Sequence, residues 1–138
     1  MLFMKQLSFR LKPGQYLKEE IVKVAKENHV KAGVVLCAVG SLKRLVLRLA
    51  GATVDGEQIM DRQDSFEIVS MTGTVSENGC HLHLSASDQE GYLYGGHLKD
   101  GCEIDTTVEL VIGIFDDVVF DRVMDEETGF KELVIREI

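Results

Sequence analysis

Residues 80–87 alternate strictly between apolar and polar side chains, in the order Cys-His-Leu-His-Leu-Ser-Ala-Ser. Successive side chains of a β-strand point to opposite faces, so this pattern predicts a strand with Leu82 and Leu84 buried and His81 and His83 on the other face. Strand-like runs recur along most of the chain, and the clearest are GVVLCAV, LKRLVLRLAG, SFEIVSMTGTVS, CEIDTTVELVIGIF, VVFDRVM and FKELVIREI. The chain is therefore expected to be built mainly from β-strands.

Only one segment has a helical period. Residues 15–29 place apolar side chains at helical spacing, with acidic residues near the start and a lysine near the end, as the helix macrodipole favours. Turn-forming groups separate the strand-like runs, among them Glu-Asn-Gly, the glycine-rich segment 91–96 and Asp116-Asp117. The sequence predicts an α+β fold, with a mostly antiparallel sheet of seven or eight strands and one main N-terminal helix.

The length and composition predict a single domain spanning residues 1–138. The chain has one proline, no internal repeat and no low-complexity linker. The longest nearly apolar runs, such as Val30–Leu42, are too short to cross a bilayer, and residues 1–11 lack the apolar region of a signal peptide. We expect a cytoplasmic protein without a membrane partner. Three cysteines without paired spacing (Cys37, Cys80 and Cys102) are expected to be reduced thiols, mostly packed in the interior.

The charge is divided unevenly along the chain. The net charge is −8, but residues 1–62 hold 11 Lys or Arg against 6 Asp or Glu, whereas residues 63–138 hold 4 against 17. The overall negative charge opposes non-specific binding to nucleic acid, which needs a dense cationic surface. The basic first half can still attract an anion.

Three of the four histidines fall within residues 80–98. His81 and His83 are two positions apart on one strand, so their Cα atoms lie about 6.5–7 Å apart, a span that two imidazoles can bridge to one metal ion. Gly95 and Gly96 permit the tight chain path that would bring His97 back across them. Three histidines with an open fourth position are typical of a reactive zinc site, and the alternative is a solvated polar strand.

Carboxylates follow on the next predicted strand. Glu103, Asp105 and Glu109 share one face, and if this strand pairs beside residues 80–87, Glu109 or Asp105 could orient a histidine, complete the ligand set or act as a general base. The alternative is a solvated acidic face. His29 is expected to contact the carbonyls at the helix end and to stay outside the site.

The segment HLHLSASDQEGYLYGGHLKDGCEIDTTVELVI closely resembles the signature of the plant and prokaryote conserved domain (PPC, also PCC), in its stand-alone prokaryotic form. FEIVSMTGTVS and AVGSL resemble further motifs of that family, and the likeness covers nearly the whole chain. The resemblance implies a curved antiparallel sheet, assembly into homotrimers and a metal site on His81, His83 and His97, holding zinc or another divalent transition metal.

Members of this family are often labelled DNA-binding, and the plant relatives carry AT-hook motifs for the minor groove. This chain has no Arg-Gly-Arg-Pro hook, and Asp64 and Ser65 stand where the plant segment has Gly-Arg. The module that supplies minor-groove contacts is therefore missing.

Three functions follow as hypotheses. The favoured one is a homo-oligomeric, trimeric binding or regulatory module with a closed three-histidine metal site. The second is a zinc-dependent lyase or hydrolase resembling the acetolactate decarboxylase fold, with Glu109 as base and Tyr94 or Lys99 contacting a small-molecule substrate; an open metal position facing a pocket would favour it. The third is DNA binding through Lys43, Arg44, Arg48 and the helix lysines.

Overall fold

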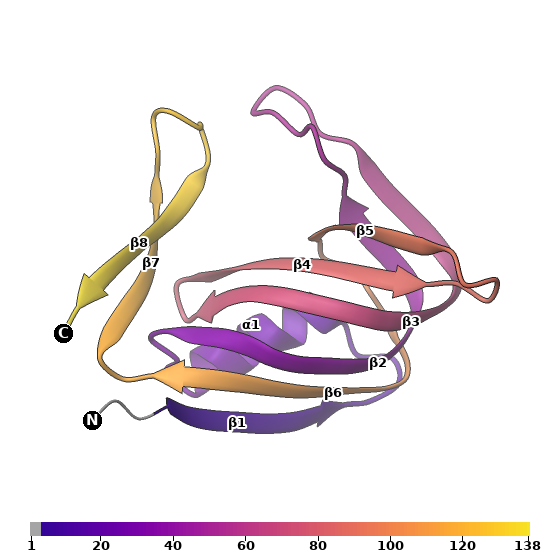
Figure 1. The fold of residues 1–138 in the computed structure, drawn as a ribbon, viewed down its shortest axis with the longest axis horizontal. Helices are drawn as coiled ribbons and strands as arrows, with labels where there is room; N and C mark the ends of the chain where they lie inside the picture. Colours follow the sequence, from indigo (N-terminus) through magenta and orange to yellow (C-terminus); the bar gives the residue numbers. More distant parts are fainter. Residues whose placement is uncertain (1–3) are drawn as a thin grey trace.

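The structure, a computed structural model, describes residues 4–138. These residues form one α-helix and eight strands (Figure 1). In chain order the elements are β1 (Met4–Leu11), α1 (Leu17–Glu27), β2 (Gly33–Arg48), β3 (Ile59–Ser76), β4 (Gly79–Ser87), β5 (Leu93–Leu98), β6 (Ile104–Phe115), β7 (Val118–Met124) and β8 (Lys131–Glu137). The predicted α+β class with one N-terminal helix is confirmed. Within residues 4–138, no helix is long and apolar enough to cross a membrane.

Six strands form one antiparallel sheet in the order β1-β6-β2-β3-β4-β5. The end of β2 also pairs with β5, through Leu47 opposite Leu98 and Arg48 opposite His97. Because β2 contacts both β3 and β5, the strands from β2 to β5 curl round and close on one another (Figure 1). This closure brings the end of β2 beside the histidine-bearing β4–β5 pair.

The core lies between α1 and the inner face of the sheet. Leu17, Ile21 and Ala25 lie on one stripe of α1 and are fully buried, and Leu82 and Leu84 on β4 are each 2% exposed. Burying such side chains is the main favourable contribution to folding. The alternation predicted for residues 80–87 is therefore confirmed, and it turns His81 and His83 away from the core.

The helix is shorter than the predicted range 15–29. At its start, Tyr16 is extended and forms a β-bridge with Glu103. At its end, His29 has a φ of +50°, which helical residues do not adopt. The β-bridge of Tyr16 and the positive φ of His29 therefore limit the helix, and the spacing of apolar residues does not reveal either.

Strand β6 does not lie beside β4. It pairs with β1 on one side and with β2 on the other, so β2 and β3 separate it from β4. The conditional pairing of the acidic strand with residues 80–87 is therefore wrong for the single chain. Strands that follow one another in the chain need not be neighbours in the sheet. Here β6 follows β5 in the chain but lies between β1 and β2.

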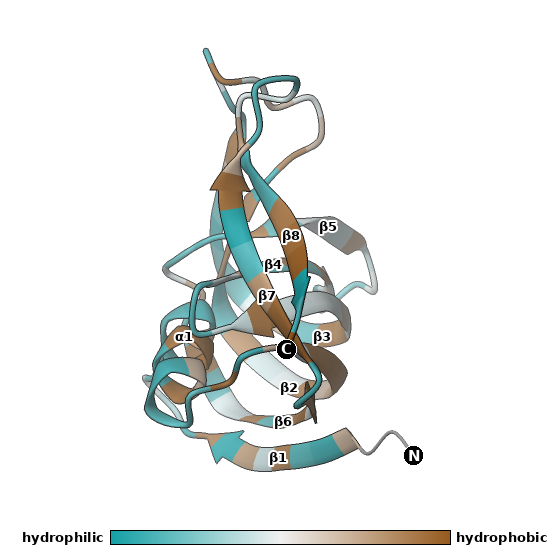
Figure 2. Cartoon of the chain, turned by 90° about the vertical axis from the view of Figure 1, so that its left-hand side faces the viewer, coloured by the Kyte–Doolittle hydropathy of each residue, from teal (hydrophilic) through white to brown (hydrophobic). Residues whose placement is uncertain are grey.

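The last two strands form a separate hairpin that stands beside the main sheet (Figures 1 and 2). The hydroxyl of Ser76 and the side-chain amide of Asn78 both donate to the carbonyl of Phe120, at 2.8 and 3.2 Å. The guanidinium of Arg122 donates to the hydroxyl of Thr74 at 2.8 Å. These bonds fix the hairpin against the turn between β3 and β4.

The three cysteines are free thiols, but they are not equally packed. Cys102 is buried and Cys80 is half-buried, whereas Cys37 is exposed. The expectation of mostly packed thiols fails at Cys37, because the bulge in β2 between Val35 and Cys37 turns this side chain outward.

Candidate metal centre

The pairing of β4 with β5 brings the three histidines together. His83 lies directly opposite His97, and His81 is two residues earlier on the same face of β4. Gly96 allows β5 to pass close to β2, since a Cβ there would lie 2.6 Å from the carbonyl oxygen of Arg48. The expectation that the two glycines return His97 across His81 and His83 is confirmed.

The distances between the imidazoles suit a shared metal ion. The Nε2 atoms of His81 and His83 are 3.2 Å apart, and one nitrogen from each of the three rings lies within 4.8 Å of the others. Tetrahedral bonds of about 2.0–2.1 Å place neighbouring ligand nitrogens about 3.3 Å apart. The His81–His83 pair has about this spacing and a nitrogen of His97 lies within 4.8 Å of both, so the donor set fits a divalent transition metal.

The cluster opens onto three hollows, and each hollow is lined by two of the three histidines. His81 and His97 line one of about 430 Å³, His81 and His83 one of about 290 Å³, and His83 and His97 one of about 400 Å³. The imidazoles therefore stand where the hollows meet. A ligand can approach this point from the outer side of the sheet, so the cluster is open rather than closed.

The surroundings of His81 and His97 favour the uncharged form of both imidazoles. Partial burial, followed by the repulsion of the nearby Arg48 guanidinium, lowers the pKa of His97 to about 4. Burial also lowers the pKa of His81, followed by the effects of His83 and Arg122. A neutral imidazole has the free lone pair that metal coordination requires.

The predicted carboxylates do not join the cluster. Glu109 lies opposite Arg10 and Val39, and two strands separate β6 from β4, a span of about 14 Å at about 4.8 Å per strand. Asp105 lines a different hollow, which it shares with Ser41 and Ser65. Within one chain neither carboxylate orients a histidine.

The predicted substrate contacts also lie elsewhere. The hydroxyl of Tyr94 is 3.3 Å from a carboxylate oxygen of Asp88, and the guanidinium of Arg62 lies 4.5 Å from the centre of its ring. The ammonium of Lys99 is 3.8 Å from Glu57. Neither Tyr94 nor Lys99 lines any of the three hollows at the histidines.

His29 stays outside the cluster, as predicted, but its contact differs from the prediction. Its Nδ1 lies 3.5 Å from the carboxylate of Glu77, and its side chain is largely exposed. The side chain of Asn28 takes the expected role, since its amide donates to the carbonyl of Val24 at 2.8 Å.

Two arginines lie at the cluster that local sequence patterns do not place there. Arg48 Nη2 is 3.5 Å from His97 Nδ1, and Arg48 and Arg122 both line the 430 Å³ hollow. In the sequence Arg48 belongs to an alternating strand, and Arg122 lies 39 positions beyond His83. The spacing of residues in the sequence does not relate these arginines to the histidines, because only the pairing of distant strands brings them together.

The chain belongs to the family of the Plants and Prokaryotes Conserved (PCC) domain, whose sequence model matches residues 2–116. Among curated proteins, it is 40% identical over 135 residues to the "Bifunctional protein GlmU" of Synechococcus sp. (strain JA-2-3B'a(2-13)). That match covers 98% of this chain but 21% of the relative, so the chain spans about a fifth of the length of the curated protein it matches.

Solved structures share the fold over nearly the full chain. A hypothetical protein from Salmonella cholerae-suis is 34% identical with a TM-score of 0.91, and the match covers 99% of this chain and 96% of that one. A metal-containing protein from Archaeoglobus fulgidus is 24% identical with a TM-score of 0.81, covering 94% and 93% of the two chains. A PPC protein from Pyrococcus horikoshii is 21% identical with a TM-score of 0.85, covering 100% and 97%.

Two more structures, from Bacteroides thetaiotaomicron and Ralstonia eutropha, have names that propose DNA binding. They are 16% and 18% identical to this chain, with TM-scores of 0.81 and 0.80, and they cover 97% and 94% of it and 97% and 90% of their own chains. At this identity the likeness shows a shared fold.

Proposed function

We propose that this chain is a PPC-domain binding module that holds a divalent transition metal on His81, His83 and His97 and assembles with copies of itself. The observation that carries the proposal is the convergence of three imidazoles, with one nitrogen from each within 4.8 Å of the others. Zinc suits such a set, since three histidines with a free position are a common zinc environment. The name of the Archaeoglobus fulgidus relative, a metal-containing protein, supports the same reading.

Assembly is supported by apolar side chains on the outer surface of the sheet. Leu36, Val39 and Val69 are between 47% and 56% exposed, although they lie in long central strands. Exposed apolar groups in such positions mark contact surfaces between proteins. The resemblance to the PPC family makes a trimer the expected assembly.

The test of this proposal is metal content and mass measured on the same untagged preparation. We expect elemental analysis to find about one transition-metal ion per subunit, as three converging ligands imply. We expect light scattering to give a mass of about three chains, each of 15.4 kDa. A metal-free monomer, unchanged after zinc is supplied and excess removed, would contradict both parts.

A metal-dependent enzyme is the second candidate, and the open cluster favours it. His81 and His97 border a hollow of about 430 Å³, which is within the usual size range of ligand pockets. A divalent metal bound there would act as a Lewis acid toward a carbonyl or phosphoryl oxygen. Glu109 is too far from the histidines to act as the base within one chain, so this function would need a base closer to them.

DNA binding has weaker support in the structure, because two of its proposed cations, Lys43 and Arg44, already have close acidic partners. Lys43 lies 2.8 Å from Glu103, and Arg44 forms two hydrogen bonds with Asp61, at 2.9 and 2.7 Å. We expect no measurable affinity for a duplex of about 20 base pairs at 150 mM salt, measured by fluorescence anisotropy. Tight binding that weakens steeply between 50 and 200 mM salt would reverse this conclusion.

A further inference from the structure

The 430 Å³ hollow beside the histidines, called here the basic pocket, is formed by parts of the chain that are distant in sequence. Its lining residues are Lys18, Val22, Arg48, Asn78, Gly79, Cys80, His81, His97, Arg122, Phe130, Lys131 and Glu132. They come from the helix, the end of β2, the β3–β4 turn, the start of β4, β5 and the β7–β8 hairpin. The pocket therefore lies where the hairpin stands against the curled sheet.

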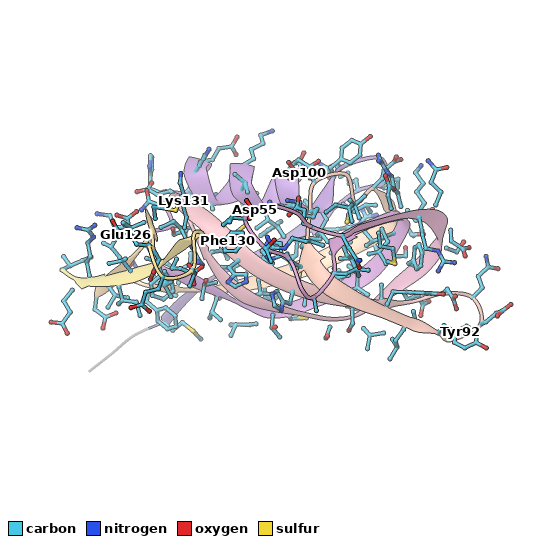
Figure 3. All side chains as sticks on the ribbon, turned by 90° about the horizontal axis from the view of Figure 1, so that it is seen from above. Asp55, Tyr92, Asp100, Glu126, Phe130 and Lys131 are labelled. Atoms are coloured by element: carbon cyan, nitrogen blue, oxygen red, sulfur yellow. The ribbon has the colours of Figure 1, made fainter. Side chains whose placement is uncertain are left out.

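The hairpin loop and the loop between β2 and β3 meet at this end of the molecule. A Cβ on Gly129 would lie 2.4 Å from Cγ1 of Val54, so the two loops are in contact. Figure 3 shows Asp55, Phe130 and Lys131 close together when the molecule is seen from above. Phe130, the residue after Gly129, lines the pocket, and its ring centre lies 5.6 Å from the Arg48 guanidinium.

The lining of the basic pocket is strongly cationic in an acidic protein. Four basic side chains, Lys18, Arg48, Arg122 and Lys131, line it with one carboxylate, Glu132. The chain as a whole carries a net charge of −8. This local excess of positive charge makes the pocket a candidate recognition site for an anion.

The acidic groups near these cations leave their charges largely available. Arg48 is 3.9 Å from Glu57, and Lys18 is 3.8 Å from Asp100, both near the outer limit for an ion pair. Arg122 donates to the neutral hydroxyl of Thr74 and, within residues 4–138, has no carboxylate within 4.0 Å.

Partial burial increases the value of an anionic ligand here. The side chains of Lys18 and Arg48 are 24% and 23% exposed, so each has lost much of its contact with water. A partly desolvated guanidinium forms strong, directional hydrogen bonds with carboxylate or phosphate oxygens. Val22 and Phe130 add apolar surface, which suits an organic molecule rather than a bare inorganic ion.

We propose that the basic pocket binds a small organic oxyanion, a carboxylate or phosphate ester, on Arg48, Arg122 and Lys131, with the other end of the molecule directed toward His81 and His97. The contact with a bound metal rests on the function proposed above, whereas the contacts with the cations do not. Both hairpin residues, Arg122 and Lys131, lie beyond residues 2–116 that match the family. The family match therefore does not by itself account for these two cations.

Calorimetric titration of the full untagged chain tests the pocket, using metal-free and zinc-loaded protein. The probes are 3-phosphoglycerate, glycerol 3-phosphate and glycerate, with glycerol as the neutral control. We expect at least one anionic probe to bind metal-free protein and glycerol not to bind. The stronger of glycerol 3-phosphate and glycerate identifies whether phosphate or carboxylate is recognised. We expect zinc to tighten binding of that probe by about tenfold through the added contact.

Matched variants separate the pocket from general electrostatics. Arg122→Gln should weaken binding by about tenfold, the effect of one charge-assisted hydrogen bond, and the exposed Lys131→Gln should weaken it without a risk to folding. Arg136→Gln removes an equal charge from the same hairpin, outside the pocket, and should leave binding unchanged. Equal losses in Arg122→Gln and Arg136→Gln, binding of glycerol, or no binding of any anionic probe would overturn the proposal.

Metal analysis of the same samples distinguishes the two proposals. If the wild type holds no metal but binds a probe in an Arg122-dependent way, the basic pocket stands and the metal site fails. If metal binds and no anionic probe does, in either form of the protein, the basic pocket fails alone.

Discussion

Replacing His81 and His97 together by alanine is expected to reduce bound metal from about one ion per subunit to less than about a tenth of that. His83 alone would remain, and one imidazole does not hold a transition metal against dialysis. The fourth histidine, His29, lies outside the cluster beside Glu77, so it cannot replace the two lost ligands. Elemental analysis of untagged protein measures the loss directly.

Thermal unfolding gives an independent measure of the same site. A metal ion whose free concentration is 100 times its dissociation constant stabilises the folded chain by about 2.7 kcal/mol. A chelator should therefore lower the melting temperature of the wild type and have no effect on the double variant. His29→Ala is the matched control, since His29 is exposed and contacts Glu77 rather than the cluster. Equal metal content in wild type and double variant would show that the ligands lie elsewhere.

The part of the site that could be predicted from sequence is the part built by local pairing. Alternation along residues 80–87 places His81 and His83 on one face, and the short connection to β5 places His97 opposite His83. These relations need only the two-residue period of a strand and one hairpin. The strand content and the single helix were predictable for the same reason.

The rest depends on contacts between distant segments. The acidic strand returns to an inner position between β1 and β2, so Glu109 lies far from the histidines. Bulges in β2 and β3 shift the register, and one turns Cys37 outward. The hairpin brings Arg122 to the cluster across a gap in sequence that has no periodic signal. Sheet order and register are set by packing of the whole chain.

The substitution Gly73→Ala is expected to be among the most destabilising single changes in the chain. Gly73 lies opposite Leu82 in the β3–β4 pair and has a φ of +146°. A Cβ at this position would lie 1.9 Å from the carbonyl oxygen of His81, well inside van der Waals contact. Because the obstructing atom is backbone, β4 would have to move away from β3.

We expect a loss of about 3–5 kcal/mol in the free energy of unfolding, which combines overpacking with the cost of positive φ for alanine. The melting temperature should fall on the order of 10–20 °C. The metal content of the folded fraction should fall as well, because the displaced backbone carries His81. Circular dichroism during heating and elemental analysis check the two effects.

Gly91→Ala separates the steric clash from the backbone conformation. Gly91 lies in the turn between β4 and β5 and has a φ of +87°, yet a Cβ there would have no atom within 4 Å. Its replacement should cost only the conformational part, about 1–2 kcal/mol, and leave the metal bound. If the two variants lost equal stability, β4 would not approach Gly73 this closely. A much larger loss for Gly73→Ala would show that the geometry of the histidine cluster depends on this close contact between the backbones of β3 and β4.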